Sequence, residues 1–108
     1  MTLSLPDPVS TYFEVSNGSD IARLTRCFAP DAVVVDEGRT YRGHDAIQSW
    51  QREAQKKFQY TVEPVSISRD GYRLTVTAQV AGNFPGSPAR LDHVFVLAGD
   101  RIASLEIG

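Results

Sequence analysis

The chain has 108 residues, of which 42% are apolar and 22% are charged, a composition that indicates one soluble globular domain over residues 1–108 and excludes a disordered or collagen-like chain. With 11 Lys and Arg against 13 Asp and Glu, the net charge is −2, so the chain lacks the basic excess that nucleic-acid binding or anionic-membrane binding needs. The single cysteine, Cys27, excludes an internal disulfide and a thiolate metal cluster. Without a secretory signal or a stretch as long as a membrane span, we expect a cytoplasmic protein.

Two helices are predicted first. Asp7 followed by Pro8 is a common helix start, and Asn17-Gly18 is a common helix end. The apolar face of this helix consists of Val9, Tyr12 and Phe13. A second helix begins at Ser19 or Asp20 and is expected to stop at Pro30. Its apolar face consists of Ile21, Leu24, Cys27 and Phe28.

A strand, a turn, a short strand and a third helix are predicted next. The β-branched run at residues 32–36 predicts the strand, Glu37-Gly38 the turn, and residues 39–42 the returning strand. The third helix follows Gly43, and its apolar face consists of Ile47, Trp50, Ala54 and Phe58. Its opposite face is charged at Arg52, Lys56 and Lys57.

From residue 60 onward, apolar residues alternate with polar ones, which predicts strands. Pro64 indicates an edge position or a bulge in the first of them, and Asp70-Gly71 predicts a hairpin. A strand over residues 74–80, a loop over 82–88 and strands over 91–97 and 101–107 follow. We therefore expect an α+β fold, with three helices packed on a curved, mostly antiparallel sheet that forms a cone with an internal pocket.

Three polar residues interrupt apolar patterns: Tyr12, Asp36 and Asp92. Asp92 shares one face of its strand with Val94 and Val96. An apolar environment raises the pKa of a carboxyl group, and a buried tyrosine hydroxyl can donate to an oxyanion. Each residue also has a structural explanation. Tyr12 can be a core residue, Asp36 can begin the turn, and Asp92 can be exposed near its strand end.

The two histidines do not predict a metal site, because no ligand spacing surrounds them. His93 follows Asp92, so we expect it on the opposite face of the strand, in an interface or structural role. With Phe95 and Leu97 it forms an apolar strip outside the pocket. Such a strip predicts a homodimer built through the sheet faces.

Four segments carry a family resemblance: residues 12–20, Phe28-Ala29-Pro30-Asp31-Ala32-Val33-Val34-Val35-Asp36, Tyr41-Arg42-Gly43-His44-Asp45-Ala46-Ile47, and Leu91-Asp92-His93-Val94-Phe95. Over residues 9–108 the chain resembles the SnoaL-like and ketosteroid-isomerase-like branch of the nuclear-transport-factor-2-like superfamily. The resemblance implies that Tyr12 forms the oxyanion hole, that Asp36 is the general base and that Asp92 is a neutral, hydrogen-bond-donating acid. Gln51 stands where the isomerases have a supporting tyrosine.

The resemblance further implies an enzyme without a cofactor or metal, isomerase- or cyclase-like, that transfers a proton next to a carbonyl of an apolar, steroid- or polyketide-like substrate. The predicted substrate-binding wall consists of Phe13, Trp50, Phe58, Val76, Ala78, Phe84 and Val94. Phe84 lies on the 82–88 loop and is placed to act as a lid. The alternative is a non-catalytic ligand-binding or dimeric association module of the same fold.

Overall fold

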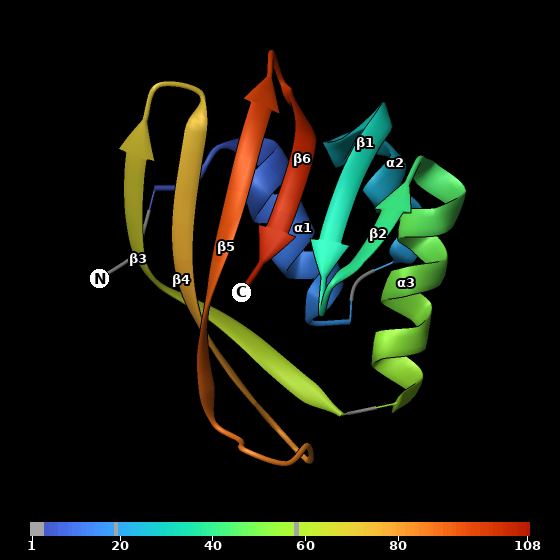
Figure 1. Ribbon diagram of the computed structural model, residues 1–108, viewed down its shortest axis with the longest axis vertical. Coiled ribbons are helices and arrows are strands. Elements are labelled where there is room, and N and C mark those ends of the chain that lie inside the picture. Colours follow the sequence, from blue (N-terminus) through green and yellow to red (C-terminus); the bar gives the residue numbers. More distant parts are fainter. Residues whose placement is uncertain (1–3, 19, 58) are drawn as a thin grey trace.

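Helices pack against one side of a single sheet in the computed structural model, which describes residues 4–18, 20–57 and 59–108 (Figure 1). The helical elements are α1 (Asp7–Ser16), the 3-10 helix η1 (Ile21–Arg23), α2 (Leu24–Cys27) and α3 (His44–Lys57). The strands are β1 (Phe28–Asp36), β2 (Arg39–Arg42), β3 (Tyr60–Asp70), β4 (Arg73–Gly82), β5 (Ala89–Ala98) and β6 (Arg101–Ile107). None of the described helices is long and apolar enough to cross a membrane.

The sheet is mixed and curved, with the strand order β2-β1-β6-β5-β4-β3. Strand β1 runs parallel to β6, and every other neighbouring pair is antiparallel. This arrangement joins the first half of the chain to the last strand at the middle of the sheet. The predicted α+β class and mostly antiparallel sheet are confirmed.

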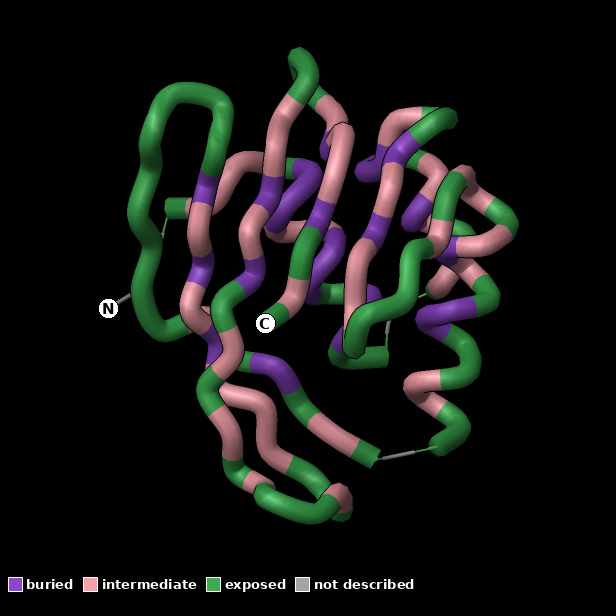
Figure 2. Tube along the Cα trace, viewed as in Figure 1, coloured by how far each residue is buried: buried purple, intermediate pink, exposed green. Residues whose placement is uncertain are grey.

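The core lies between the helices and the inner face of the sheet (Figure 2). On β4 the alternate residues Leu74, Val76 and Ala78 are buried, as the period of two in the sequence predicts. From the helical side, Val9, Phe13, Val15, Leu24 and Ile47 are fully or almost fully buried. Burial of this apolar surface is the main term that favours folding.

Several sequence predictions are confirmed by the strands. β2 and β6 have the predicted bounds, and the hairpin after Asp70 joins β3 to β4. Strand β3 lies at the edge of the sheet and its register shifts between Pro64 and Ser66, so the proline marks both an edge and a bulge. Proline has no N–H for a strand ladder and is tolerated at such positions.

The second predicted helix is wrong in length. It ends at Cys27, and Phe28 already has extended backbone angles (φ −98°, ψ 142°). Pro30 therefore lies inside β1 rather than at the end of a helix. The β1–β6 register is irregular between Phe28 and Val33, which lets the strand accommodate a residue without an N–H.

The predicted faces of β5 are also wrong. His93 and Phe95 are buried on the inner face, whereas Asp92 is exposed. The reason is the register with β4, in which Val76 pairs with His93 and Thr77 pairs with Asp92. Because both alternating sets of this strand contain apolar residues, its own pattern does not identify the inner face. The expected outward strip of His93 and Phe95 does not exist.

Asn17 fastens the end of α1 to the edge strand β3. Its Nδ2 donates to the carbonyl oxygen of Val62 at 2.8 Å, and its Oδ1 accepts from the N–H of Val62 at 2.7 Å. These bonds satisfy backbone groups of an edge strand that would otherwise face water or another chain. The side chain that ends the helix thus also positions β3 against it.

We expect Asn17→Ala to lower the free energy of unfolding by about 1–3 kcal/mol, because both bonds to Val62 are lost. Urea denaturation of the variant measures the difference. Asn17→Asp keeps an acceptor for the Val62 N–H, so its free energy of unfolding should lie between those of Asn17→Ala and the parent chain. Equal stability of Asn17→Ala and the parent chain would contradict this role.

Candidate functional site

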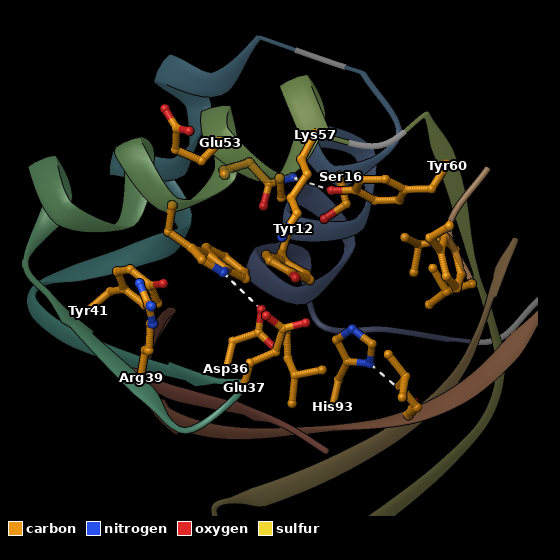
Figure 3. A pocket seen from close by; sticks show the side chains of 18 of the residues that line it. Tyr12, Ser16, Asp36, Glu37, Arg39, Tyr41, Glu53, Lys57, Tyr60 and His93 are labelled. Atoms are coloured by element: carbon orange, nitrogen blue, oxygen red, sulfur yellow. Dashed lines mark hydrogen bonds between the residues drawn. The ribbon is translucent and has the colours of Figure 1, made fainter. Parts of the chain in front are cut away.

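A cavity of about 970 Å³ lies between the helices and the inner face of the sheet (Figure 3). Its rim is formed by exposed residues: Glu37, Arg39, Ser49, Glu53, Lys57 and Pro85. Its inner wall combines aromatic and aliphatic side chains with polar ones, of which Tyr12, Asp36 and His93 are central. A large concave site with apolar walls and convergent polar groups is the usual form of a small-molecule site.

Asp36 ends β1 and is half-buried in the cavity wall. Its Oδ2 accepts a hydrogen bond from Nε1 of Trp50 on α3 at 3.0 Å. Burial raises the pKa of the Asp36 carboxyl group above its usual value, and the hydrogen bond from Trp50 partly opposes this. The charge of Glu37 raises this pKa further, whereas the backbone N–H of Glu37 lowers it. Among the described residues, no lysine or arginine forms an ion pair with Asp36. The carboxylate is therefore positioned but not neutralised.

The turn after Asp36 has an unusual backbone. Glu37 and Gly38 both have positive φ angles, 53° and 74°, as a type I′ hairpin requires. Asp36 and Arg39 form the pair that flanks this turn. The turn explanation for Asp36 therefore holds for its backbone, while its side chain enters the cavity wall.

Tyr12 is 3% exposed and lies at the centre of an aromatic cluster. Its ring is parallel to that of Trp50, with centroids 6.4 Å apart. Burial raises the pKa of the Tyr12 hydroxyl far above its usual value. The phenol therefore stays protonated and can act as a hydrogen-bond donor.

His93 points into the cavity from β5, on the same side as Asp36 (Figure 3). It is 3% exposed, and its ring lies 5.4 Å from that of Phe13 and 6.1 Å from that of Tyr12. Burial lowers the pKa of His93, which favours the neutral imidazole. Nδ1 lies 3.2 Å from the carbonyl oxygen of Leu91.

A further set of polar side chains, Gln51, Tyr60 and Ser16, lines the cavity. Gln51 is 1% exposed, and its Nε2 donates to the Tyr60 hydroxyl at 3.5 Å. Burial raises the pKa of Tyr60. Ser16 Oγ also lines the cavity, and it is buried without a hydrogen-bond partner among the described residues. A buried hydroxyl of this kind is a natural partner for a ligand oxygen or a water molecule.

The prediction that Asp92 lies in the pocket is wrong. Asp92 is exposed on the outer face of β5, where its Oδ1 accepts from Thr77 Oγ1 at 2.8 Å. Its backbone exchanges two hydrogen bonds with Gly108, of 2.9 and 3.1 Å, which hold the strand in this register. The structural explanation given for Asp92 from the sequence, an exposed aspartate near a strand end, is therefore correct.

The predicted wall is only partly placed at the cavity. Trp50 and Phe84 line it, whereas Phe13, Val76 and Ala78 are buried in the core and are not among its lining residues. Val94 lies on the outer face with Asp92, because the two are separated by one position. Phe58 lies outside the described residues.

Several cavity residues were not predicted, among them the polar residues Ser16, Gln51, Tyr60 and His93. Ser16 follows Tyr12 by four positions, so the helical repeat places it on the same face. Gln51 follows Trp50 directly and its burial is not visible in the apolar pattern. In the described part of the chain, no three His, Cys, Asp or Glu side chains gather in a metal-binding arrangement.

Comparison with known proteins agrees with the fold described above. A family profile described as a SnoaL-like domain matches residues 9–105. A structure from Sinorhizobium meliloti, named as a candidate polyketide cyclase, is 44% identical and superposes with a TM-score of 0.92 over 96% of this chain and 95% of its own. The search of curated proteins found no match.

Two more distant structures share the fold. One is a protein from Catenulispora acidiphila with a ketosteroid isomerase-like fold, in complex with trimethylamine, at 22% identity, a TM-score of 0.84 and coverage of 97% of this chain and 86% of that one. The other is a candidate isomerase of the SnoaL-like family from Agrobacterium tumefaciens, at 19% identity, a TM-score of 0.78 and coverage of 94% and 92%. The likeness to the Catenulispora structure shows that this chain has the ketosteroid isomerase-like fold. The profile and the 44% identical structure together show that this chain belongs to the SnoaL-like domain family.

Proposed function

We propose that the chain is an enzyme that transfers a proton next to a carbonyl group of an apolar, ring-containing small molecule. The observation that supports this most strongly is the Asp36 carboxylate, which lies in an aromatic cavity, is held by Trp50 and has no cationic partner among the described residues. A carboxylate placed there is a better base than one in water, because burial raises its pKa.

The proposed step uses two side chains. Asp36 takes a proton from the carbon beside the carbonyl, and the electrons of that C–H bond form the enolate. The protonated Tyr12 hydroxyl donates a hydrogen bond to the enolate oxygen. Return of the proton from Asp36 to another carbon completes an isomerisation. In a cyclisation the enolate carbon instead attacks a second carbonyl, and the proton held by Asp36 passes to the alkoxide oxygen that forms. No redox partner is needed for either outcome.

The cavity wall favours a flat apolar ligand that is enclosed by the curved sheet and the helices as in a cone. Tyr12, Tyr41 and Trp50 form a continuous aromatic surface, with centroid distances of 6.1 and 6.4 Å. Arg39 and Lys57 also line the cavity, but both residues are exposed, so water screens their charge. Phosphorylated compounds would lose hydration on entry and gain only these two screened cations, so steroid- or polyketide-like carbonyl compounds are preferred.

Homodimer formation and a cytoplasmic location also remain proposals. The sheet face turned to the viewer in Figure 1 carries no described helix. It includes the half-buried side chains of Val94 and Val96 on β5. Apolar residues on an uncovered sheet face are typical of an interface.

The first prediction concerns the base. With 2-tetralone as the probe, the chain should accelerate exchange of the protons beside the carbonyl with deuterium, and Asp36→Asn should reduce the rate by about 100-fold or more. Proton NMR in deuterated buffer measures the exchange. Binding of 2-tetralone without any acceleration would support the alternative, a non-catalytic binding module.

The second prediction concerns Trp50. Trp50→Phe removes the N–H donor that lowers the pKa of Asp36, so this pKa should rise. Exchange of 2-tetralone increases with pH as Asp36 ionises, and the midpoint of that increase should move to higher pH in the variant. Tyr41→Phe is the control, because the Tyr41 ring lies 6.1 Å from that of Trp50 and forms no hydrogen bond with Asp36. A midpoint that stays in place in Trp50→Phe would contradict the assignment.

The third prediction concerns assembly. Light scattering at micromolar concentration should give about 24 kDa, twice the 11.9 kDa of one chain. Replacing Val94 and Val96 with Lys should shift the protein toward the monomer mass, since charges would face each other across the interface. A mass near 12 kDa for the unmodified chain would refute the dimer.

A further inference from the structure

The tautomer of His93 is fixed by its neighbour on the same strand. Nδ1 lies 3.2 Å from the carbonyl oxygen of Leu91, and a carbonyl oxygen can only accept a hydrogen bond. Nδ1 therefore carries the proton and donates it to Leu91. In the neutral ring, Nε2 then holds a lone pair and no proton, so it can only accept.

Nε2 of His93 is available to a ligand. It forms no hydrogen bond with the described residues, yet it is not enclosed, because Ser16 Oγ is the one buried and unpartnered side-chain polar atom among them. The ring lies among the rings of Phe13, Tyr12 and Phe95, with centroids 5.4 to 6.3 Å away. Since His93 lines the cavity, the open side of Nε2 is reached from there.

The sheet places His93 at a defined distance from Asp36. Ile107 of β6 pairs with Asp36 on one side and with His93 on the other. Two strand spacings separate the two backbones, which corresponds to about 9–10 Å. All three residues line the cavity, so Asp36 and His93 stand on either side of Ile107. A fused two-ring ligand lying over Ile107 is long enough to span this separation and to contact both side chains.

We propose that His93 Nε2 accepts a hydrogen bond from a hydroxyl group of the substrate, across the ring system from the carbonyl that Asp36 and Tyr12 act on. This rests on the proposed function and narrows its substrate to hydroxylated ring ketones. An ether or a second ketone at this position would place an oxygen lone pair against the nitrogen lone pair, with no proton between them. Such a pair leaves both acceptors unsatisfied in a buried site.

Three probes differ only at the relevant position: 2-tetralone, 6-hydroxy-2-tetralone and 6-methoxy-2-tetralone. In the parent chain the hydroxy compound should bind about tenfold more tightly than the methoxy compound, as measured by calorimetry. His93→Phe keeps an aromatic ring but removes Nε2, so the ratio should fall to about one. His93→Gln carries an amide oxygen at a similar reach and should restore part of the preference.

A preference of the same size in His93→Phe would overturn the proposal. Nitrogen-15 NMR of the unsubstituted chain provides a test that needs no variant. It should show a protonated Nδ1 and an unprotonated Nε2, and the Nε2 signal should change when 6-hydroxy-2-tetralone binds but not when the methoxy compound binds. A proton on Nε2 in the neutral ring would equally overturn the proposal.

These results separate the inference from the proposed function. Asp36→Asn should lose proton exchange of 2-tetralone while it keeps the hydroxyl preference, because His93 is unchanged. If the chain accelerates proton exchange of 2-tetralone but binds the hydroxy and methoxy compounds equally well, the proposed function stands and the role of His93 is overturned. A hydroxyl preference that depends on His93, without any exchange, contradicts the function alone.

Discussion

The parallel pairing of β1 with β6 is the constraint on which the rest of the structure depends. It sets the strand from the first third of the chain beside the last strand, with Asp36 opposite Ile107. The antiparallel pairing of β6 with β5 then sets His93 on the other side of Ile107. Asp36 and His93 face a common cavity because of this register, although 56 positions separate them in the sequence.

The polar side chains of the site are only partly satisfied by hydrogen bonds within the protein. The Asp36 carboxylate receives one hydrogen bond from Trp50, and His93 donates one proton to Leu91, so each is oriented by a neighbour and keeps a free acceptor. Tyr12, in contrast, is a donor that burial keeps protonated. Asp36 and His93 as acceptors and Tyr12 as a donor, set in an apolar cavity, favour a ligand whose oxygen groups complement them. The apolar surroundings bind water less well than such a ligand.

The sequence predicts the elements well because most of them have local signals. Glu37-Gly38, Asp70-Gly71 and Pro64 identify two hairpins and a bulge through backbone chemistry. Tyr12, Asp36 and Trp50, which the resemblance assigns to a site, all line the cavity. The faces of β5 have no local signal, since both of its alternating sets contain apolar residues. Only the pairing of Val76 with His93 decides between them, and that is a long-range property. Because the two faces of β5 were predicted the wrong way round, Asp92 was expected in the cavity where the structure places His93.

A crystal structure with bound 2-naphthol, a flat analogue of the enol of 2-tetralone, tests the central claim most directly. The account predicts that the naphthol lies in the cavity over Ile107, with its oxygen at about 2.6–3.2 Å from the Tyr12 hydroxyl and the adjacent ring carbon beside the Asp36 carboxylate. A naphthol bound outside the cavity, or an Asp36 side chain turned away from it, would contradict the account.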